Sequence, residues 1–113
     1  MAESALVRAL LLRGSALGAR LFRNNVGALQ DSRGGWVTYG LCKGSPDLVG
    51  WRSVTVTPDM VGTRLAVFVG VEAKTDRGWL SEEQRAFLGA LEAAGGIAVV
   101  ARSTEDLAEA LRK

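Results

Sequence analysis

The sequence contains no histidine and only one cysteine, Cys42. Without histidine, the chain cannot form a Ser-His-Asp or Cys-His nucleophilic site, a zinc–histidine centre or a histidine general base. One cysteine cannot form an intramolecular disulfide or a cysteine-rich metal site, and in its apolar segment Cys42 is expected to be a core residue. An enzyme built from this chain must therefore work with carboxylates, lysine and a hard metal ion.

Long apolar runs are also missing. No stretch approaches the roughly 18 residues that a membrane span needs, and the apolar segment 5–19 is interrupted by Arg8 and Arg13. A signal peptide is not expected, because Glu3 stands where a basic region would precede the apolar segment. We therefore expect a cytoplasmic protein with no membrane partner.

The net charge of +2 is too small to indicate a partner by itself, but its distribution is informative. Residues 1–46 carry six basic residues against two acids, a balance of +4, which leaves −2 for residues 47–113. A basic N-terminal part beside a more acidic part would suit a polyanion held near a cation site. A solvated helix face explains Arg8 and Arg13 equally well.

Hydrophobic periodicity predicts one α/β domain over residues 1–113, in the order helix, three strands, helix, strand, helix. Arg23 to Gly27 is a turn signal. The strand–helix–strand segment implies a parallel crossover and hence a mixed sheet. The expected elements are a helix over 3–21, strands over 36–42, 48–56 and 65–74, a helix from the capping box 81–84 to about 94, a strand over 97–101 and a helix from about 103. Gly14 and Gly18 weaken the later part of the first helix, so a bend or two shorter pieces is the alternative there.

The most informative motif is Glu72-Ala73-Lys74, which ends the apolar run 65–71 that we interpret as a buried strand. Acids and lysines are rarely buried unless paired, and residues two apart on a strand point to the same face. Glu72 and Lys74 should therefore project together, and Asp47 could bring a second carboxylate to the same strand ends. Two carboxylates and a lysine are the minimum set for Mg²⁺-assisted phosphodiester hydrolysis. The simpler alternatives are an ion pair at a strand end and a turn at Asp47.

Two more polar residues begin helices whose apolar stripe should face the sheet. Gln84 precedes the apolar residues of its helix by three, four and seven positions, and Glu3 does the same in the first helix. Gln84 could instead serve only the capping box with Ser81. Glu3 would be favoured by about 0.3–1 kcal/mol at a helix N-terminus in any case. The hypothesis is that four polar groups meet at one site.

The three tryptophans are candidates for stacking on nucleic-acid bases. We expect core or interface packing for Trp36 and Trp51. Trp79 lies beside Arg77 in a predicted loop next to the site, which makes it the best nucleic-acid contact of the three.

Four short motifs follow one another at spacings that together are quite specific: Arg23-Asn24…Gly27, Gly44-Ser45-Pro46-Asp47-Leu48, Val71-Glu72-Ala73-Lys74 and Ser81-x-x-Gln84. This ordered set resembles the virus-type replication-repair nuclease family, VRR-NUC, of the PD-(D/E)XK nuclease superfamily. The resemblance extends nearly end to end and is closest to the small stand-alone members of phages and prophages. It implies a restriction-endonuclease-like core, with a central mixed β-sheet flanked by helices.

The resemblance also implies a metal-dependent DNA endonuclease. Asp47 and Glu72 would bind Mg²⁺ or Mn²⁺, with the Ala73 carbonyl as a further ligand. Lys74 would position or deprotonate the attacking water, and Gln84 would orient the water or the lysine. Glu3 matches an acidic residue of the superfamily's first helix that assists the metal site.

Stand-alone members of the family are similar to Holliday-junction resolvases and tend to be homodimers. The expected substrate is therefore branched DNA, and two sites related by a two-fold axis would face its two strands. The alternatives are a flap or general duplex nuclease or nickase of the same fold, and a catalytically silent DNA-binding module. The DNA contacts that we predict are Arg23, Asn24, Lys43, Arg77 and Trp79.

Overall fold

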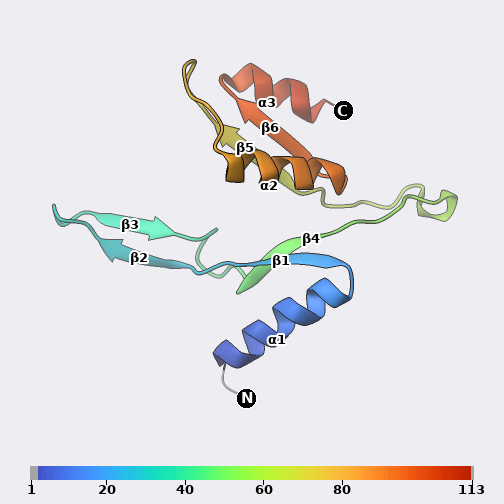
Figure 1. The fold of residues 1–113 in the computed structure, drawn as a ribbon, viewed down its shortest axis with the longest axis horizontal. Coiled ribbons are helices and arrows are strands. Elements are labelled where there is room, and N and C mark those ends of the chain that lie inside the picture. The colour runs from blue at the N-terminus through green and yellow to red at the C-terminus, as the bar shows by residue number, and fades with distance from the viewer. Residues whose placement is uncertain (1–2, 113) are drawn as a thin grey trace. The chain divides into compact units, whose positions relative to one another are not determined.

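The computed structural model describes residues 3–112, which fall into two compact units (Figure 1). The first unit ends at Arg52 and the second begins at Ser53, and each is described by itself. The first contains α1 (Glu3–Ala16), β1 (Ala19–Arg23), β2 (Gly27–Gln30), β3 (Trp36–Tyr39) and β4 (Leu48–Arg52). The second contains the 3₁₀ turn η1 (Pro58–Met60), β5 (Val69–Ala73), α2 (Glu82–Ala93), β6 (Ile97–Ala101) and α3 (Thr104–Leu111).

The first helix is shorter than the sequence predicted. It ends at Ala16 rather than near residue 21, because Gly18 takes a φ of +87° and turns the chain out of the helix. The next residues form β1, which pairs antiparallel with β4, from Ala19 opposite Arg52 to Arg23 opposite Leu48. The prediction of a helix that continues to residue 21 was therefore wrong, whereas the predicted turn is confirmed at residues 24–26, which join β1 to β2.

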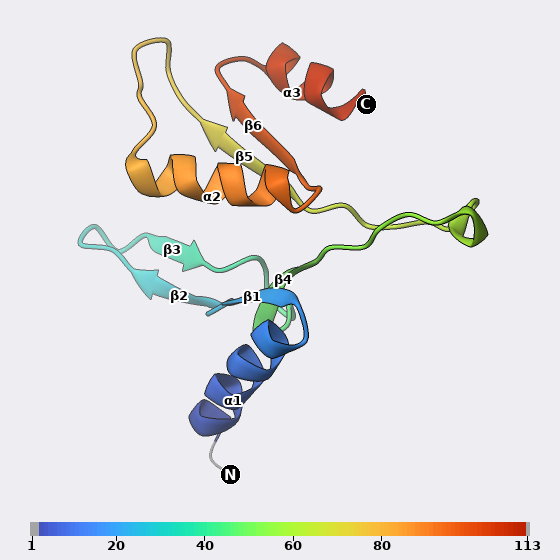
Figure 2. The same ribbon diagram turned by 45° about the vertical axis from the view of Figure 1, so that its right-hand side comes forward.

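Strands β2 and β3 form a hairpin, seen in Figure 2, of which only β3 was predicted. The Asp31 carboxylate closes its turn by accepting hydrogen bonds from the backbone N–H groups of Arg33 and Gly35. Strand β3 stops at Tyr39, and Cys42 lies beyond it as an exposed residue rather than in the core. Trp36 is also 70% exposed, so it does not pack in a core.

The second unit confirms the predicted strand–helix–strand crossover. β5 and β6 pair in parallel, from Val69 opposite Ile97 to Ala73 opposite Ala101. Helix α2 begins with the predicted capping box at Ser81 and ends before Gly95, which has a φ of +99°. Helix α3 begins from the N-cap residue Ser103, as predicted.

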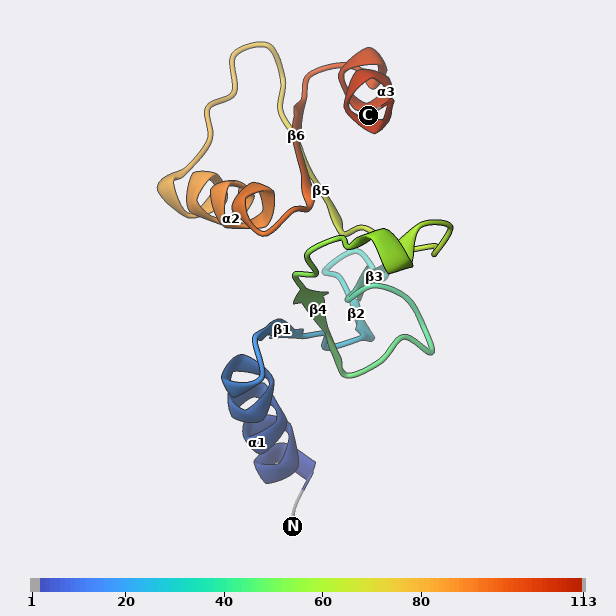
Figure 3. The same ribbon diagram turned by 90° about the vertical axis from the view of Figure 1, so that its right-hand side faces the viewer.

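Figure 3, in which this sheet is seen edge-on, shows α2 on one face and α3 on the other. Leu91 of α2 is fully buried and packs over two glycines. A Cβ atom at Gly70 would lie 2.8 Å from a Leu91 methyl carbon, and one at Gly96 would lie 2.2 Å from the other. The absence of these side chains is what allows the helix to approach the sheet.

Helix α3 packs against β6, so β5 is covered by α2 on one face only, and the prediction of a buried strand was wrong. Gly70 and Glu72 are half-buried, whereas Val69 and Val71 are 40% and 45% exposed. The strands of the described residues pair as three two-stranded sheets, β1–β4, β2–β3 and β5–β6. The structure is thus mixed α/β, and the single central sheet that we expected is not confirmed. No helix within residues 3–112 is long and apolar enough to cross a membrane.

Candidate active site

The carboxylate of Glu72 is the centre of a polar cluster in the second unit. Its Oε1 atom accepts a 2.8 Å hydrogen bond from Nε2 of Gln84 and lies 3.7 Å from Nζ of Lys74. The side chains of Glu72 and Lys74 are 31% and 20% exposed, so the pair is partly shielded from water. Strand alternation places both residues on one face, as the sequence predicted.

Gln84 reaches this carboxylate because of its position in the first turn of α2. Its Oε1 accepts a hydrogen bond from the Ser81 backbone N–H at 2.9 Å, and its own N–H donates to the Ser81 hydroxyl at 3.1 Å. The amide group at the other end of the same side chain then donates to Glu72. Gln84 therefore serves both the cap and the cluster, and the alternative of a cap alone is excluded.

A hollow of about 280 Å³ lies against this cluster. Its walls are strand β5 and the first turns of α2, with Phe87 and Leu88 contributing apolar surface and Glu72 and Gln84 polar groups. Both contacts of Glu72 fall on Oε1, which leaves Oε2 without a hydrogen-bond partner among residues 3–112. A carboxylate oxygen held in place and free to coordinate is what a hard cation requires.

Asp47 belongs to the first unit and is an exposed residue directly before β4. Its carbonyl oxygen accepts a 2.8 Å hydrogen bond from the backbone N–H of Asn24. The Asn24 side chain is buried and donates both amide hydrogens inside the protein, to the Ser45 hydroxyl and the Pro46 carbonyl. Asn24 was predicted to contact DNA, but in this structure it has no free donor for that purpose.

Sequence reasoning missed Arg102, which follows β6. Its two terminal nitrogens donate to the carbonyl oxygens of Thr75 and Gly78, the latter at 2.9 Å, and so hold the loop that follows Lys74. The loop carries Arg77 and Trp79. No local pattern indicates this contact, because Arg102 lies 24 positions after Gly78 and 27 positions after Thr75.

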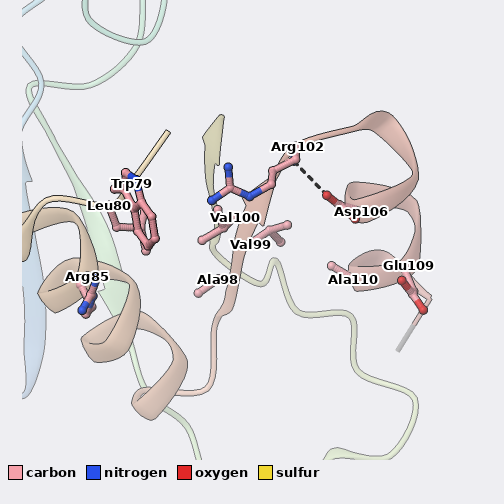
Figure 4. A pocket seen from close by; sticks show the side chains of 10 residues that line it. All are labelled: Trp79, Leu80, Arg85, Ala98, Val99, Val100, Arg102, Asp106, Glu109 and Ala110. Atoms are coloured by element: carbon pink, nitrogen blue, oxygen red, sulfur yellow. Dashed lines mark hydrogen bonds between the residues drawn. The ribbon is translucent and has the colours of Figure 1, made fainter. Parts of the chain in front are cut away.

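A second, open hollow of about 770 Å³ lies beside this loop and does not include Glu72. Figure 4 shows Trp79 and Arg85 on one side of the β6 residues and Asp106, Glu109 and Ala110 of α3 on the other. The dashed line marks the bond from the Arg102 backbone N–H to the Asp106 carboxylate. Trp79 is 85% exposed at this rim and is free to meet a ligand.

The sequence model of the VRR-NUC domain matches residues 9–105, which is most of the chain and includes Asp47, Glu72, Lys74 and Gln84. The chain belongs to the VRR-NUC domain family. Searches of curated proteins and of solved structures gave no match. A VRR-NUC domain is a nuclease domain of the PD-(D/E)XK type; such nucleases bind DNA and typically use a divalent metal ion.

The cluster around Glu72 offers oxygen atoms of the kind that such an ion binds. It does not by itself offer enough of them to hold the ion. Glu72 supplies a carboxylate, and the neighbouring Ala73 supplies a backbone carbonyl; both are the hard oxygen donors that Mg²⁺ and Mn²⁺ prefer. Within residues 3–112, however, no three Asp, Glu, Cys or His side chains form a group that could hold a metal ion. Asp47 is the predicted second carboxylate, and the side chain of Glu3 lies outside the described part of the chain.

The remaining predicted DNA contacts of this VRR-NUC domain are exposed. Arg23 ends β1, Lys43 lies in the loop before Asp47, and Arg77 lies in the loop held by Arg102. Exposure is what a phosphate contact requires, so their roles stay predictions.

Proposed function

We propose that this VRR-NUC protein is a metal-dependent DNA endonuclease whose reactive centre contains Glu72, Lys74 and Gln84, with Asp47 as the second carboxylate. The observation that carries the proposal is the double contact of Glu72 Oε1, with Gln84 Nε2 at 2.8 Å and Lys74 Nζ at 3.7 Å. In a domain of a nuclease family, an acid that contacts both an amine and an amide beside a hollow suits a hydrolytic centre.

In this proposal, Glu72, Asp47 and the Ala73 carbonyl hold Mg²⁺ or Mn²⁺, and Glu3 assists them. The ion, when bound, supplies positive charge to the scissile phosphate and makes the attacking water more acidic. Water adds to phosphorus, one P–O ester bond breaks, and the leaving oxygen ends as a hydroxyl. The chain's own residues then have to orient the water and balance the charge that grows on the phosphoryl oxygens.

Lys74 suits that task because its amine lies next to the carboxylate and its side chain is partly shielded from water. A charged lysine stabilises the developing negative charge and orders a water, whereas a neutral one would accept the water's proton. Gln84 keeps Glu72 in one orientation through a hydrogen bond to a charged group, a kind of bond worth about 1.5–3 kcal/mol. The carboxylate is therefore set before metal and DNA arrive.

The proposed substrate is branched DNA such as a Holliday junction, cut by a homodimer with a restriction-endonuclease-like core. Support comes from the resemblance to the small stand-alone members of the family and from the +4 balance of residues 1–46, which suits a polyanion. A two-fold dimer would present one site to each of two strands.

The test is cleavage of a labelled four-way junction, compared with flap, single-stranded and linear duplex DNA of matched sequence. Each would be incubated with Mg²⁺, with Mn²⁺ and with EDTA. We expect paired incisions at the junction that require the metal. Cutting of every substrate would retain the nuclease and reject its junction specificity, and binding without any cutting would reject the nuclease in favour of a silent DNA-binding module.

Two variants should separate the chemistry from the fold. Glu72→Gln and Lys74→Met preserve size and should lower cleavage by at least about 10²-fold while DNA binding remains. Glu92→Gln removes an exposed acid near the far end of α2 and should cleave like the wild type. Wild-type cleavage by Glu72→Gln or Lys74→Met would reject the assigned centre.

A further inference from the structure

Asn24 is the one polar side chain that is buried among the described residues, with 8% of its surface exposed. Burying an amide is costly unless its hydrogen bonds are replaced. Asn24 forms hydrogen bonds with residues of the loop that precedes Asp47, in place of those it would form with water. Its Nδ2 donates to the Ser45 hydroxyl at 2.7 Å and to the Pro46 carbonyl at 2.8 Å, and its Oδ1 accepts from the Leu41 N–H at 2.9 Å.

Hydrogen bonds between residues of the same loop also hold it in shape beside the Asn24 amide. The Ser45 hydroxyl donates to the Cys42 carbonyl at 2.6 Å, and the Ser45 N–H donates to the same carbonyl at 3.0 Å. Gly44 supplies the turn between them with a φ of +88°, a conformation that favours glycine. Ser45 therefore links Asn24 to the rest of the loop.

The bonds of Asn24 fix the backbone on both sides of Asp47. Its side chain holds the carbonyl of Pro46, and its own backbone N–H holds the carbonyl of Asp47 at 2.8 Å. The next residue, Leu48, is already paired with Arg23 in the β1–β4 sheet. The Asp47 carboxylate itself stays exposed, so it is presented to solvent from a backbone that cannot rotate freely.

We infer that Asn24 is a positioning residue, which fixes the direction in which Asp47 presents its carboxylate to the cation. The inference rests on the proposed function, because it takes Asp47 as a metal ligand. Binding sites gain affinity when their ligands are held before the ion arrives, and loss of a supporting partner typically costs 10–100-fold in metal affinity. A residue that only stabilised the fold would change the melting temperature and leave metal affinity unchanged.

The experiment measures Mn²⁺ binding to the full chain by the loss of the free-ion electron paramagnetic resonance signal, without DNA. Asn24→Asp keeps the size of the side chain but replaces both donors by an oxygen that faces the Pro46 carbonyl. We expect it to weaken Mn²⁺ binding by about tenfold or more at a temperature where circular dichroism shows it folded. Asn25→Ala, at the exposed neighbouring asparagine, is the matched control and should bind Mn²⁺ like the wild type.

Asp47→Asn separates the two ways in which the inference could fail. If Asp47→Asn loses Mn²⁺ affinity and Asn24→Asp does not, the positioning role is overturned and the proposed nuclease stands. If Asp47→Asn binds Mn²⁺ like the wild type, Asp47 is not a ligand, and the metal site of the proposed function fails together with the inference.

Ser45→Ala covers the case in which Asn24→Asp does not fold. It removes one acceptor of the Asn24 amide and leaves the bond to Pro46, so we expect a smaller, several-fold loss of Mn²⁺ affinity. Unchanged affinity in Ser45→Ala, beside a clear loss in Asp47→Asn, would overturn the positioning role.

Discussion

The side-chain amide of Gln84 has two ends, and each end holds a different part of the second unit. The oxygen accepts from Ser81 and closes the capping box, while the nitrogen donates to Glu72. A capping box accepts glutamate or glutamine at this position, because only the oxygen takes part in it. Only glutamine can also donate to a carboxylate, so the cluster accounts for the choice of glutamine over glutamate.

Gln84→Glu and Ser81→Ala should therefore separate the two roles. Gln84→Glu keeps the acceptor of the capping box and adds a negative charge at a helix N-terminus, worth about 0.3–1 kcal/mol, but it loses the stronger hydrogen bond to Glu72, so the melting temperature should fall. It also places a carboxylate against Glu72, and we expect cleavage to fall about tenfold or more. Thermal unfolding and single-turnover cleavage would be measured on the same samples.

Ser81→Ala should lower stability without lowering cleavage. It removes the N-cap hydroxyl, costing about 0.5–2 kcal/mol of stability, but leaves the hydrogen bond between Gln84 and Glu72. Below the melting transition, cleavage should stay near that of the wild type. A Gln84→Glu variant that cleaves at the wild-type rate would show that the contact with Glu72 has no role in the reaction.

At the scale of elements, the position of α2 on its sheet depends on the missing side chain of Gly70. Gly70 lies two residues before Glu72 on the same face of β5, and Leu91 occupies the space above it. The close packing of α2 at this point is what places the first turn of the helix, and so Gln84, beside the end of the strand. The position of α2 on the sheet therefore also determines the geometry of the site.

Two glycine-to-alanine variants should test this packing from opposite sides. Gly70→Ala places a methyl group 2.8 Å from a Leu91 carbon, and such overpacking typically costs about 1–3 kcal/mol. Gly89→Ala, on the open side of α2 with no atom within 4 Å, should instead stabilise the helix by up to about 1 kcal/mol. Denaturant unfolding would measure both, and a Gly70→Ala variant as stable as the wild type would contradict the close packing of Leu91 over Gly70.

At the scale of the whole molecule, the net charge of +2 is small, so DNA binding has to depend on where the basic residues are placed. Arg77 stands in the loop that Arg102 holds by two of its carbonyls, next to the exposed ring of Trp79. A loop fixed in this way presents its charge in one place. That is the condition for a defined phosphate contact rather than a diffuse one.

Arg77→Gln should therefore weaken DNA binding and lower the slope of log affinity against log salt by about one. Binding would be measured by fluorescence anisotropy in EDTA over a range of salt concentrations. Arg112→Gln removes the same charge from the end of α3, where Arg112 pairs with Glu105 at 3.1 Å, and should leave the slope unchanged. Equal slopes for wild type and Arg77→Gln would place the DNA path elsewhere.

The second unit could be predicted from the sequence because its signals are local. Ser81 and Gln84 lie three residues apart, Gly95 marks the helix end, and Glu72 and Lys74 share a face through strand alternation alone. Each of these features involves residues that are close together in the sequence, so motifs and periodicity reveal them. The contacts of Glu72 with Lys74 and Gln84 agree with the predicted site, whereas the parts assigned to Asp47 and Glu3 stay predictions.

The first unit was predicted less well because its structure depends on distant partners. The apolar spacing up to Leu21 fits a helix as well as a strand, and only the turn at Gly18 and the pairing with β4 decide between them. The same holds for Asn24, whose partners lie 17 to 22 residues away. No local pattern encodes such bonds, so a buried amide was interpreted as a surface contact.

The sharing of Gln84 between the helix start and Glu72 has a consequence for behaviour on warming. Helix ends fray more readily than a whole domain unfolds, and each opening of the first turn of α2 also releases the amide that holds the carboxylate. The fraction of molecules in which Gln84 holds Glu72 in place then depends on how often the first turn of α2 opens. The proposed nuclease would lose activity with rising temperature well before the chain as a whole unfolds, and would regain it on cooling without having to refold.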